Sequence, residues 1–173
     1  MKSRKIVYAS VSTALATLVI IVCAYTPVRF VPLVFAAAAY YVALDKCGWW
    51  GLLSIVASMT ISFFAGGAFQ TSFVLTLILF APYSVLAYAM RKIEYTTTKN
   101  WIIRGLVMLA FFIASSVLAL VLIEFITGVS LEVVIERVGE WAVVLLFAVA
   151  AIPTDFFFTF AMEKISKALG KGK

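Results

Sequence analysis

Residues 6–25 read IVYASVSTALATLVIIVCAY, an apolar run long enough to cross a membrane as one helix. A helix needs about 20 predominantly apolar residues to span the hydrocarbon core. The run follows the basic segment Met1–Lys5 and so imitates a secretory signal peptide. However, it is longer than a signal core of roughly 7–15 residues, and no small-x-small cleavage site follows it. We therefore expect a retained first transmembrane helix.

The whole chain has the composition of a membrane protein. Of its 173 residues, 65% are hydrophobic, well above the roughly 45–50% apolar content of soluble domains. Six spans of about 20 residues would use most of this length, so we expect a single transmembrane domain over residues 1–173. The net charge of +6 is explained by basic helix ends near anionic inner-leaflet lipid. Nucleic-acid binding is not expected.

The distribution of basic residues predicts six spans with both chain ends inside. Basic flanks of membrane helices are retained in the cytoplasm, and this threading leaves only Arg29 and Arg137 outside. The other twelve of the fourteen Lys and Arg residues are then cytoplasmic: Lys2, Arg4, Lys5, Lys46, Arg91, Lys92, Lys99, Arg104, Lys164, Lys167, Lys171 and Lys173. The expected fold class is all-α, an integral membrane bundle of six transmembrane helices.

The expected spans are residues 6–25, 32–44, 49–64, 72–90, 101–125 and much of 141–161. Pro82 is expected to kink the fourth span, and Arg104 is expected to snorkel to the inner surface. Between spans five and six, the segment 127–140 carries Glu132, Glu136 and Glu140 with apolar residues between them. This spacing predicts a short amphipathic helix at the outer surface.

Asp155 is the most unusual residue, because it lies inside the last span. A carboxylate at such depth is costly unless it meets water, a hydrogen-bond donor or a ligand. Pro153 permits local unwinding nearby, which is tolerated where protein or a cavity covers the backbone. Two interpretations remain open. Asp155 either lines a ligand cavity or is bonded to Ser, Thr or Tyr of a neighbouring span.

Arg29 lies in an outer loop between Pro27 and Pro32. The two prolines restrict the backbone, so the guanidinium is either held over a vestibule, where it suits an anionic or planar solute, or meets lipid phosphate.

Small residues in the first span have two interpretations as well. Ser10 with Ala14, and Ser12 with Ala16, lie four apart and therefore share a helix face that allows close backbone approach. The face either docks onto another membrane subunit or packs inside the bundle.

The sequence lacks the usual signals of an enzyme. It contains no histidine, no Walker-type phosphate loop and no GxGxxG motif, and its two cysteines lack metal-ligand spacing. Neither catalysis, nor a metal, nor a cofactor is expected, and ATP hydrolysis by this chain alone is excluded.

Four local features occur together with this size and span number. They are the small-xxx-small face around Ser10, Ala14 and Ala16, the proline-led second span from Pro32, the inner turn Asp45–Gly48 leading through Gly51 into the third span, and Pro153-Thr154-Asp155 in the last span. In these features the chain resembles the substrate-binding S subunit of an energy-coupling factor (ECF) vitamin transporter.

The resemblance implies a multi-pass protein of a prokaryotic cell membrane that captures a small, planar or vitamin-like solute in its outer half. It also implies that the first span docks on a transmembrane scaffold subunit and that paired ATPases drive import. Carried over by position, the substrate-binding residues are Arg29, Phe69, Gln70 and Asp155, and the partner-docking residues are Ser10, Ala14 and Ala16. Nickel and cobalt members use an N-terminal histidine, so a metal substrate is not expected here.

An alternative from another class is a membrane scaffold subunit of a cell-envelope assembly, of the rod-shape-determining type. It predicts no enclosed polar cavity, and small residues that face a partner rather than a pocket. A self-sufficient secondary transporter is a third possibility, but its usual inverted repeat is not visible in this sequence.

Overall fold

The computed structural model describes residues 2–25, 32–67, 71–93, 95, 97–127 and 140–170, and within these ranges the chain is helical without a strand. The α-helices are α1 (Lys2–Tyr25), α2 (Leu33–Cys47), α3 (Leu52–Ser62), α4 (Thr71–Leu75), α5 (Ala81–Ala89), α6 (Thr98–Thr127) and α8 (Glu140–Gly170). Shorter irregular helices complete them: the 3₁₀ turn η1 (Gly48–Gly51) and the π turns η2 (Phe63–Gly67) and η3 (Thr76–Phe80).

Four stretches of the described residues are long and apolar enough to cross a membrane: Ser3–Tyr25, Leu33–Ala65, Ser72–Ala89 and Thr98–Ala119. For the described residues the prediction of an all-helical chain is confirmed, and these four stretches have the length and composition that the predicted spans require. The second stretch contains α2 and α3, which run antiparallel: the hydroxyl oxygens of Tyr40 on α2 and Ser58 on α3 lie 2.6 Å apart.

Two glycines make the turn between α2 and α3. Gly48 has a φ of +66°, a conformation that costs glycine nothing and strains other residues. A Cβ on Gly51 would lie 2.6 Å from backbone atoms of Ala43, so η1, which leads into α3, touches α2 through its main chain. The predicted inner turn therefore starts later than expected. Helix α2 continues through Asp45 and Lys46 to Cys47, so the second span is longer than the expected residues 32–44.

Pro82, where we expected a kink in the fourth span, lies in the first turn of α5 and directly follows the π turn η3. Proline has no N–H to donate, and its ring collides with the carbonyl one turn earlier. The chain accommodates Pro82 with the wider π turn η3, directly before α5. Such turns are a usual site of bending in membrane helices.

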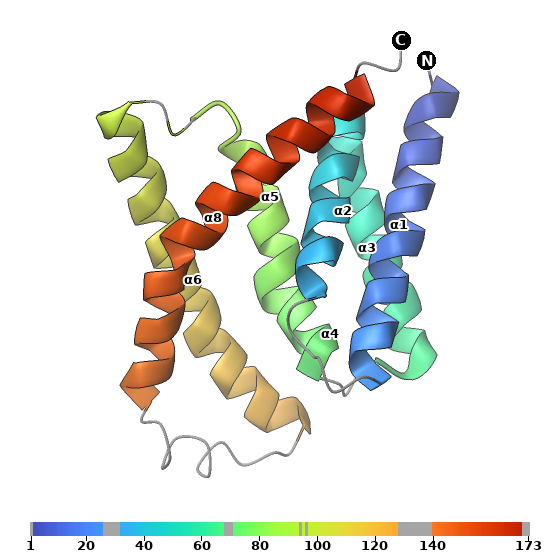
Figure 1. Ribbon diagram of the computed structural model, residues 1–173. Coiled ribbons are helices and arrows are strands. Elements are labelled where there is room, and N and C mark those ends of the chain that lie inside the picture. Colours follow the sequence, from blue (N-terminus) through green and yellow to red (C-terminus); the bar gives the residue numbers. More distant parts are fainter. Residues whose placement is uncertain are drawn as a thin grey trace.

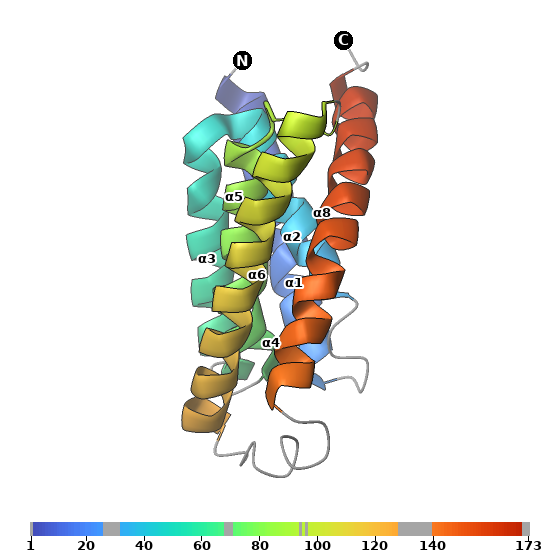
Figure 2. The same ribbon diagram turned by 90° about the vertical axis from the view of Figure 1, so that its left-hand side faces the viewer.

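The helices form two groups around two apolar cores. Helices α1, α2, α3 and α4 enclose a cluster that includes Ile20, Cys23, Leu33 and Val74, all buried. The second cluster joins α2 and α5 to the pair α6–α8 and is formed by Ala37, Leu79, Tyr83, Ala87, Met90, Met108, Phe112, Ala151, Phe158 and Met162. Figures 1 and 2 show that α1 begins and α8 ends at the same end of the molecule. The α5–α6 connection lies at this end as well.

Candidate functional site: a buried arginine–aspartate cluster

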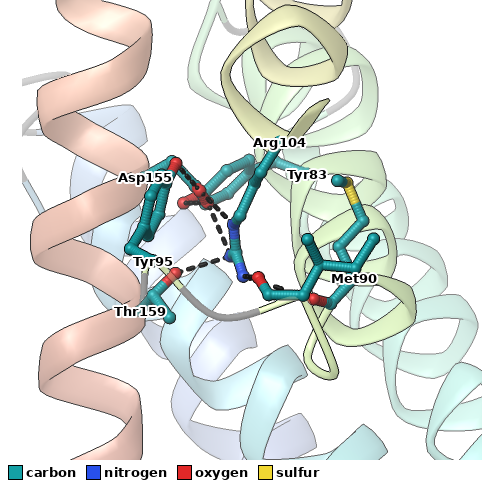
Figure 3. A network of polar contacts seen from close by, with 7 residues as sticks. Tyr83, Met90, Tyr95, Arg104, Asp155 and Thr159 are labelled. Atoms are coloured by element: carbon teal, nitrogen blue, oxygen red, sulfur yellow. Dashed lines mark hydrogen bonds and ion pairs between the residues drawn. The ribbon is translucent and has the colours of Figure 1, made fainter. Parts of the chain in front are cut away.

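An ion pair joins α6 to α8 in the interior. The Nε of Arg104 donates to Oδ2 of Asp155 at 2.6 Å, and its Nη2 donates to Oδ1 at 3.1 Å. The two side chains are 1% and 0% exposed. Two parallel bonds between guanidinium and carboxylate match the planar geometry of both groups. This bidentate pair is the centre of the site (Figure 3).

Both oxygens of Asp155 also accept a tyrosine hydroxyl. Tyr83 on α5 donates to Oδ1 at 3.0 Å, and Tyr95 in the α5–α6 connection donates to Oδ2 at 2.6 Å. The carboxylate thus accepts four hydrogen bonds, two from the guanidinium and two from hydroxyls. This explains how a charged group is held at 0% exposure, because a buried carboxylate is tolerated only when it is paired and hydrogen-bonded.

Every N–H of the guanidinium has an acceptor. Besides Asp155, Nη2 donates to the hydroxyl of Thr159 at 2.6 Å, and Nη1 donates to the carbonyls of Met90 at 3.3 Å and Ile93 at 3.0 Å. An arginine carries five N–H donors, and these bonds use all five. The two carbonyls lie just beyond the end of α5, where the helix dipole favours a cation. Arg104 therefore ties α5, α6 and α8 together.

Tyr95 covers the cluster within a group of aromatic side chains. Its ring centroid lies 4.5 Å from that of Trp101 and 5.7 Å from that of Phe156, and the Arg104 guanidinium carbon lies 5.0 Å from it. Trp101 donates its indole N–H to the Tyr95 carbonyl at 3.1 Å. Burial, and then the bond to Asp155, raise the pKa of the Tyr95 phenol, so at neutral pH it stays a hydrogen-bond donor.

The structure corrects one prediction for Arg104. We expected this side chain to snorkel to the inner surface, but it turns inward and is 1% exposed. The reason is that Asp155, Thr159 and the carbonyls of Met90 and Ile93 supply an acceptor for each of its N–H groups. The sequence did contain a signal for this inward direction. One basic and one acidic residue lie inside apolar spans, and such residues usually pair.

Of the predicted substrate-binding residues, the structure places only Asp155. Its two oxygens are occupied, so contact with a solute would require one of the four donors to move away. Arg29, Phe69 and Gln70 lie outside the described residues, as does most of the expected amphipathic segment, residues 128–139. The role of Asp155 as a solute ligand stays a prediction.

The predicted docking residues divide between two faces of α1. Ser10 and Ala14 are exposed on the outside of the bundle, whereas Ala16 is 0% exposed and belongs to the apolar core. Ser12, on the same face as Ala16, is also buried. Of these four small residues, a partner helix can therefore reach only Ser10 and Ala14.

A small pocket adjoins the cluster. Its volume is about 170 Å³, and it is lined by Val34, Ala37, Leu79, Phe80, Tyr83, Phe112, Ala150, Thr154 and Phe158. We call it the ring pocket. Its aromatic side chains meet edge to face: the Tyr83 centroid lies 5.0 Å from Phe158 and 5.7 Å from Phe112. Tyr83 thus contributes its ring to the pocket and its hydroxyl to Asp155.

A wider groove runs between α2 and α8 on the outside of the bundle. It has a volume of about 490 Å³ and is lined by Val34, Phe35, Ala38, Pro153, Thr154, Phe157, Phe158, Ala161, Met162 and Ile165. We call it the α2–α8 groove. Val34, Thr154 and Phe158 line both the groove and the ring pocket, so these three side chains separate the two.

Comparison of the chain with protein-family models, with curated proteins and with solved structures found no match. Its function is accordingly inferred from its own residues and their geometry.

Proposed function

We propose that this chain is a six-span membrane protein with both ends in the cytoplasm, and that it is the solute-binding subunit of an ATP-driven importer of the ECF type. Six helical rods support the span number: α1, α2, α3 with η2, α4 through α5, α6, and α8. At about 1.5 Å per residue, the 30 residues of α6 and the 31 of α8 exceed the roughly 30 Å of a hydrocarbon core.

The gathering of basic residues at one end supports the proposed orientation. The thiol of Cys47, next to Lys46, donates to the carbonyl of Lys5 at 3.2 Å, which brings the end of α2 to the start of α1. Trp49 in η1 packs against Tyr88 near the end of α5, with ring centroids 5.6 Å apart. The end of α8 lies at this same end. Basic residues concentrated at one end are typical of a cytoplasmic face.

The observation that carries the proposal is a pocket between four helices whose aromatic wall is hydrogen-bonded to a fully satisfied ion pair. The ring pocket offers a solute a site between α2, α5, α6 and α8. The cluster of Arg104 and Asp155 cross-links three of these helices beside the α5–α6 connection, on the proposed cytoplasmic side. A subunit without its own energy source has to hold its solute without a leak, and a closed inner end serves that purpose.

Co-purification from native membranes tests the proposal. With the chain tagged in its own cell and extracted in mild detergent, we expect a membrane scaffold subunit and two ATPase subunits to accompany it. We also expect a small molecule to be released on denaturation and detected by mass spectrometry. Recovery of cell-wall synthesis proteins without ATPases or a solute would refute the importer and favour the envelope scaffold.

Ala14→Leu is expected to reduce the co-purified scaffold subunit about tenfold, because a larger side chain prevents the close backbone approach that small residues allow. The thermal midpoint of the isolated chain should not change, since Ala14 is exposed. Ala110→Leu is the matched control, because Ala110 is exposed on α6. Equal loss of the scaffold in both variants would show that α1 is not the docking helix.

A further inference from the structure

We propose that the ring pocket binds an uncharged, apolar solute built on one flat ring or two fused rings, and that this solute enters sideways from the lipid through the α2–α8 groove. The inference rests on the proposed function, because it names the class of solute that the proposed subunit would bind. Its physical basis is the wall of the pocket, the size of the pocket and the side chains that separate it from the groove.

The wall of the ring pocket selects against charge. Of the residues that the structure describes around it, none is charged, and Tyr83 and Thr154 carry the only side-chain hydroxyls. The Tyr83 hydroxyl is already donated to Asp155. A charged solute would be buried here without a partner, which costs several kcal/mol. The same holds for a solute with many hydroxyl groups, so the pocket suits an apolar one.

The size and shape of the pocket select a flat ring. Its volume of about 170 Å³ is close to that of an apolar cavity of about 150 Å³ that takes up benzene. The rings of Tyr83 and Phe158 are inclined by 68°, and those of Tyr83 and Phe112 by 69°. Aromatic rings favour such edge-to-face contacts, so a further ring in the pocket that packs against these side chains extends the existing arrangement.

The route into the pocket passes between α2 and α8. The groove opens on the outer surface, where Phe35 and Phe157 are 62% and 68% exposed. Phe158, at 6% exposure, is the bulkiest of the three side chains that the groove and the pocket share. A rotation of this ring would join the two spaces. An apolar solute concentrates in the hydrocarbon core, so entry from this side avoids its transfer through water.

Pro153 makes movement of α8 easier at this level. It lines the α2–α8 groove next to Thr154 and lies within the helix. A proline inside a helix removes one backbone hydrogen bond and permits bending. The segment that carries Phe158 can therefore shift without the loss of a further backbone bond.

Fluorine NMR on the chain in lipid nanodiscs tests the binding, with fluorobenzene as the probe. We expect a protein-bound signal that empty nanodiscs do not show. Toluene should displace fluorobenzene at least tenfold more effectively than benzoate at equal concentration. A tenfold difference corresponds to only about 1.4 kcal/mol, which is less than the cost of burying an unpaired charge. Toluene and benzoate share the ring and differ in charge. Displacement by benzoate as effective as by toluene would overturn the inference.

Ala150→Phe should abolish the bound signal, because Ala150 lines the ring pocket but not the groove and a phenyl group there fills the space. Ala37→Leu reduces the pocket from the side of α2 and serves as a second variant, should the first fail to fold by circular dichroism. A bound signal that persists unchanged in a folded variant of either kind would place the probe elsewhere and reject the ring pocket.

Val34→Trp tests the route of entry. Val34 lines both the groove and the ring pocket, so an indole there should slow exchange between bound and free fluorobenzene about tenfold. The equilibrium affinity for fluorobenzene should change less than threefold, a difference below 1 kcal/mol. Val11→Trp is the control, because Val11 is exposed on α1. An unchanged exchange rate in Val34→Trp would exclude the α2–α8 route.

These measurements use the isolated chain, so their failure is distinct from failure of the importer proposal. Fluorobenzene binding without co-purified ATPases would support the pocket and reject the importer. Co-purified ATPases together with no bound fluorobenzene would support the importer and reject the ring solute.

Discussion

Replacing Asp155 with Asn is expected to lower the free energy of unfolding by about 3–5 kcal/mol, the usual result of removing one partner from a buried ion pair. Asparagine keeps the shape of aspartate but leaves the charge of Arg104 buried and unbalanced. Arg104→Gln should cost less, because a carboxylate can take up a proton whereas a guanidinium does not lose one. Titration with SDS in mixed micelles, followed by circular dichroism, measures both changes.

A double-mutant cycle separates the pair from its surroundings. Arg104→Met combined with Asp155→Leu removes both charges. The double variant should lose at least about 2 kcal/mol less free energy of unfolding than the summed losses of Arg104→Met alone and Asp155→Leu alone. Glu163→Gln is the control, since Glu163 pairs with Lys167 on the exposed surface of α8. Such a pair contributes about 0–1 kcal/mol. Additive single effects would contradict a direct coupling between Arg104 and Asp155.

Gly51→Ala is expected to have the second large effect, a loss of about 3 kcal/mol or more, at the upper end of the cost of overpacking. The new methyl group would meet the backbone of Ala43 at 2.6 Å. Backbone atoms cannot change rotamer, so α2 and α3 would have to separate. The same SDS titration measures the loss of stability.

Gly105→Ala is the matched control for Gly51→Ala. A Cβ at Gly105 would lie 3.6 Å from the side chain of Ile152, an ordinary contact, and alanine is also the better helix former. We expect its free energy of unfolding to stay equal or to rise slightly. If Gly51→Ala were tolerated as well as Gly105→Ala, the close contact between α2 and α3 would not be what holds the turn together.

Three of the expected spans closely match the helices of the structure. The first, residues 6–25, ends with α1 at Tyr25; the fourth, 72–90, covers α4 through α5; and the fifth, 101–125, lies within α6. Hydropathy and local backbone preferences decide such boundaries, and both are properties of adjacent residues. The other three spans differ more: residues 49–51 of the third belong to η1, and α8 continues past residue 161 to Gly170. The second span shows why. Its expected end at Leu44 was three residues early, because the polar Asp45 and Lys46 stay helical at the end of α2.

The candidate site was only half predictable. The unusual depth of Asp155 was evident, because a single carboxylate in an apolar span is conspicuous. Its partner Arg104 was not found, because near a helix end a long basic side chain can reach either the surface or the interior. The choice between these directions depends on carbonyls of the segment after α5 and, above all, on Asp155 of α8, which is remote in the sequence.

The sequence by itself determined that this chain is apolar and helical, and that it carries an acidic group deep in its last helix. These properties follow from composition and from residues adjacent in the chain. Only the tertiary structure decided that Arg104 neutralises Asp155, that Ala16 belongs to the core, and that α2, α5, α6 and α8 together line the ring pocket. Each of these depends on how side chains from separate helices fill a shared space, and packing of that kind leaves no local pattern in the sequence.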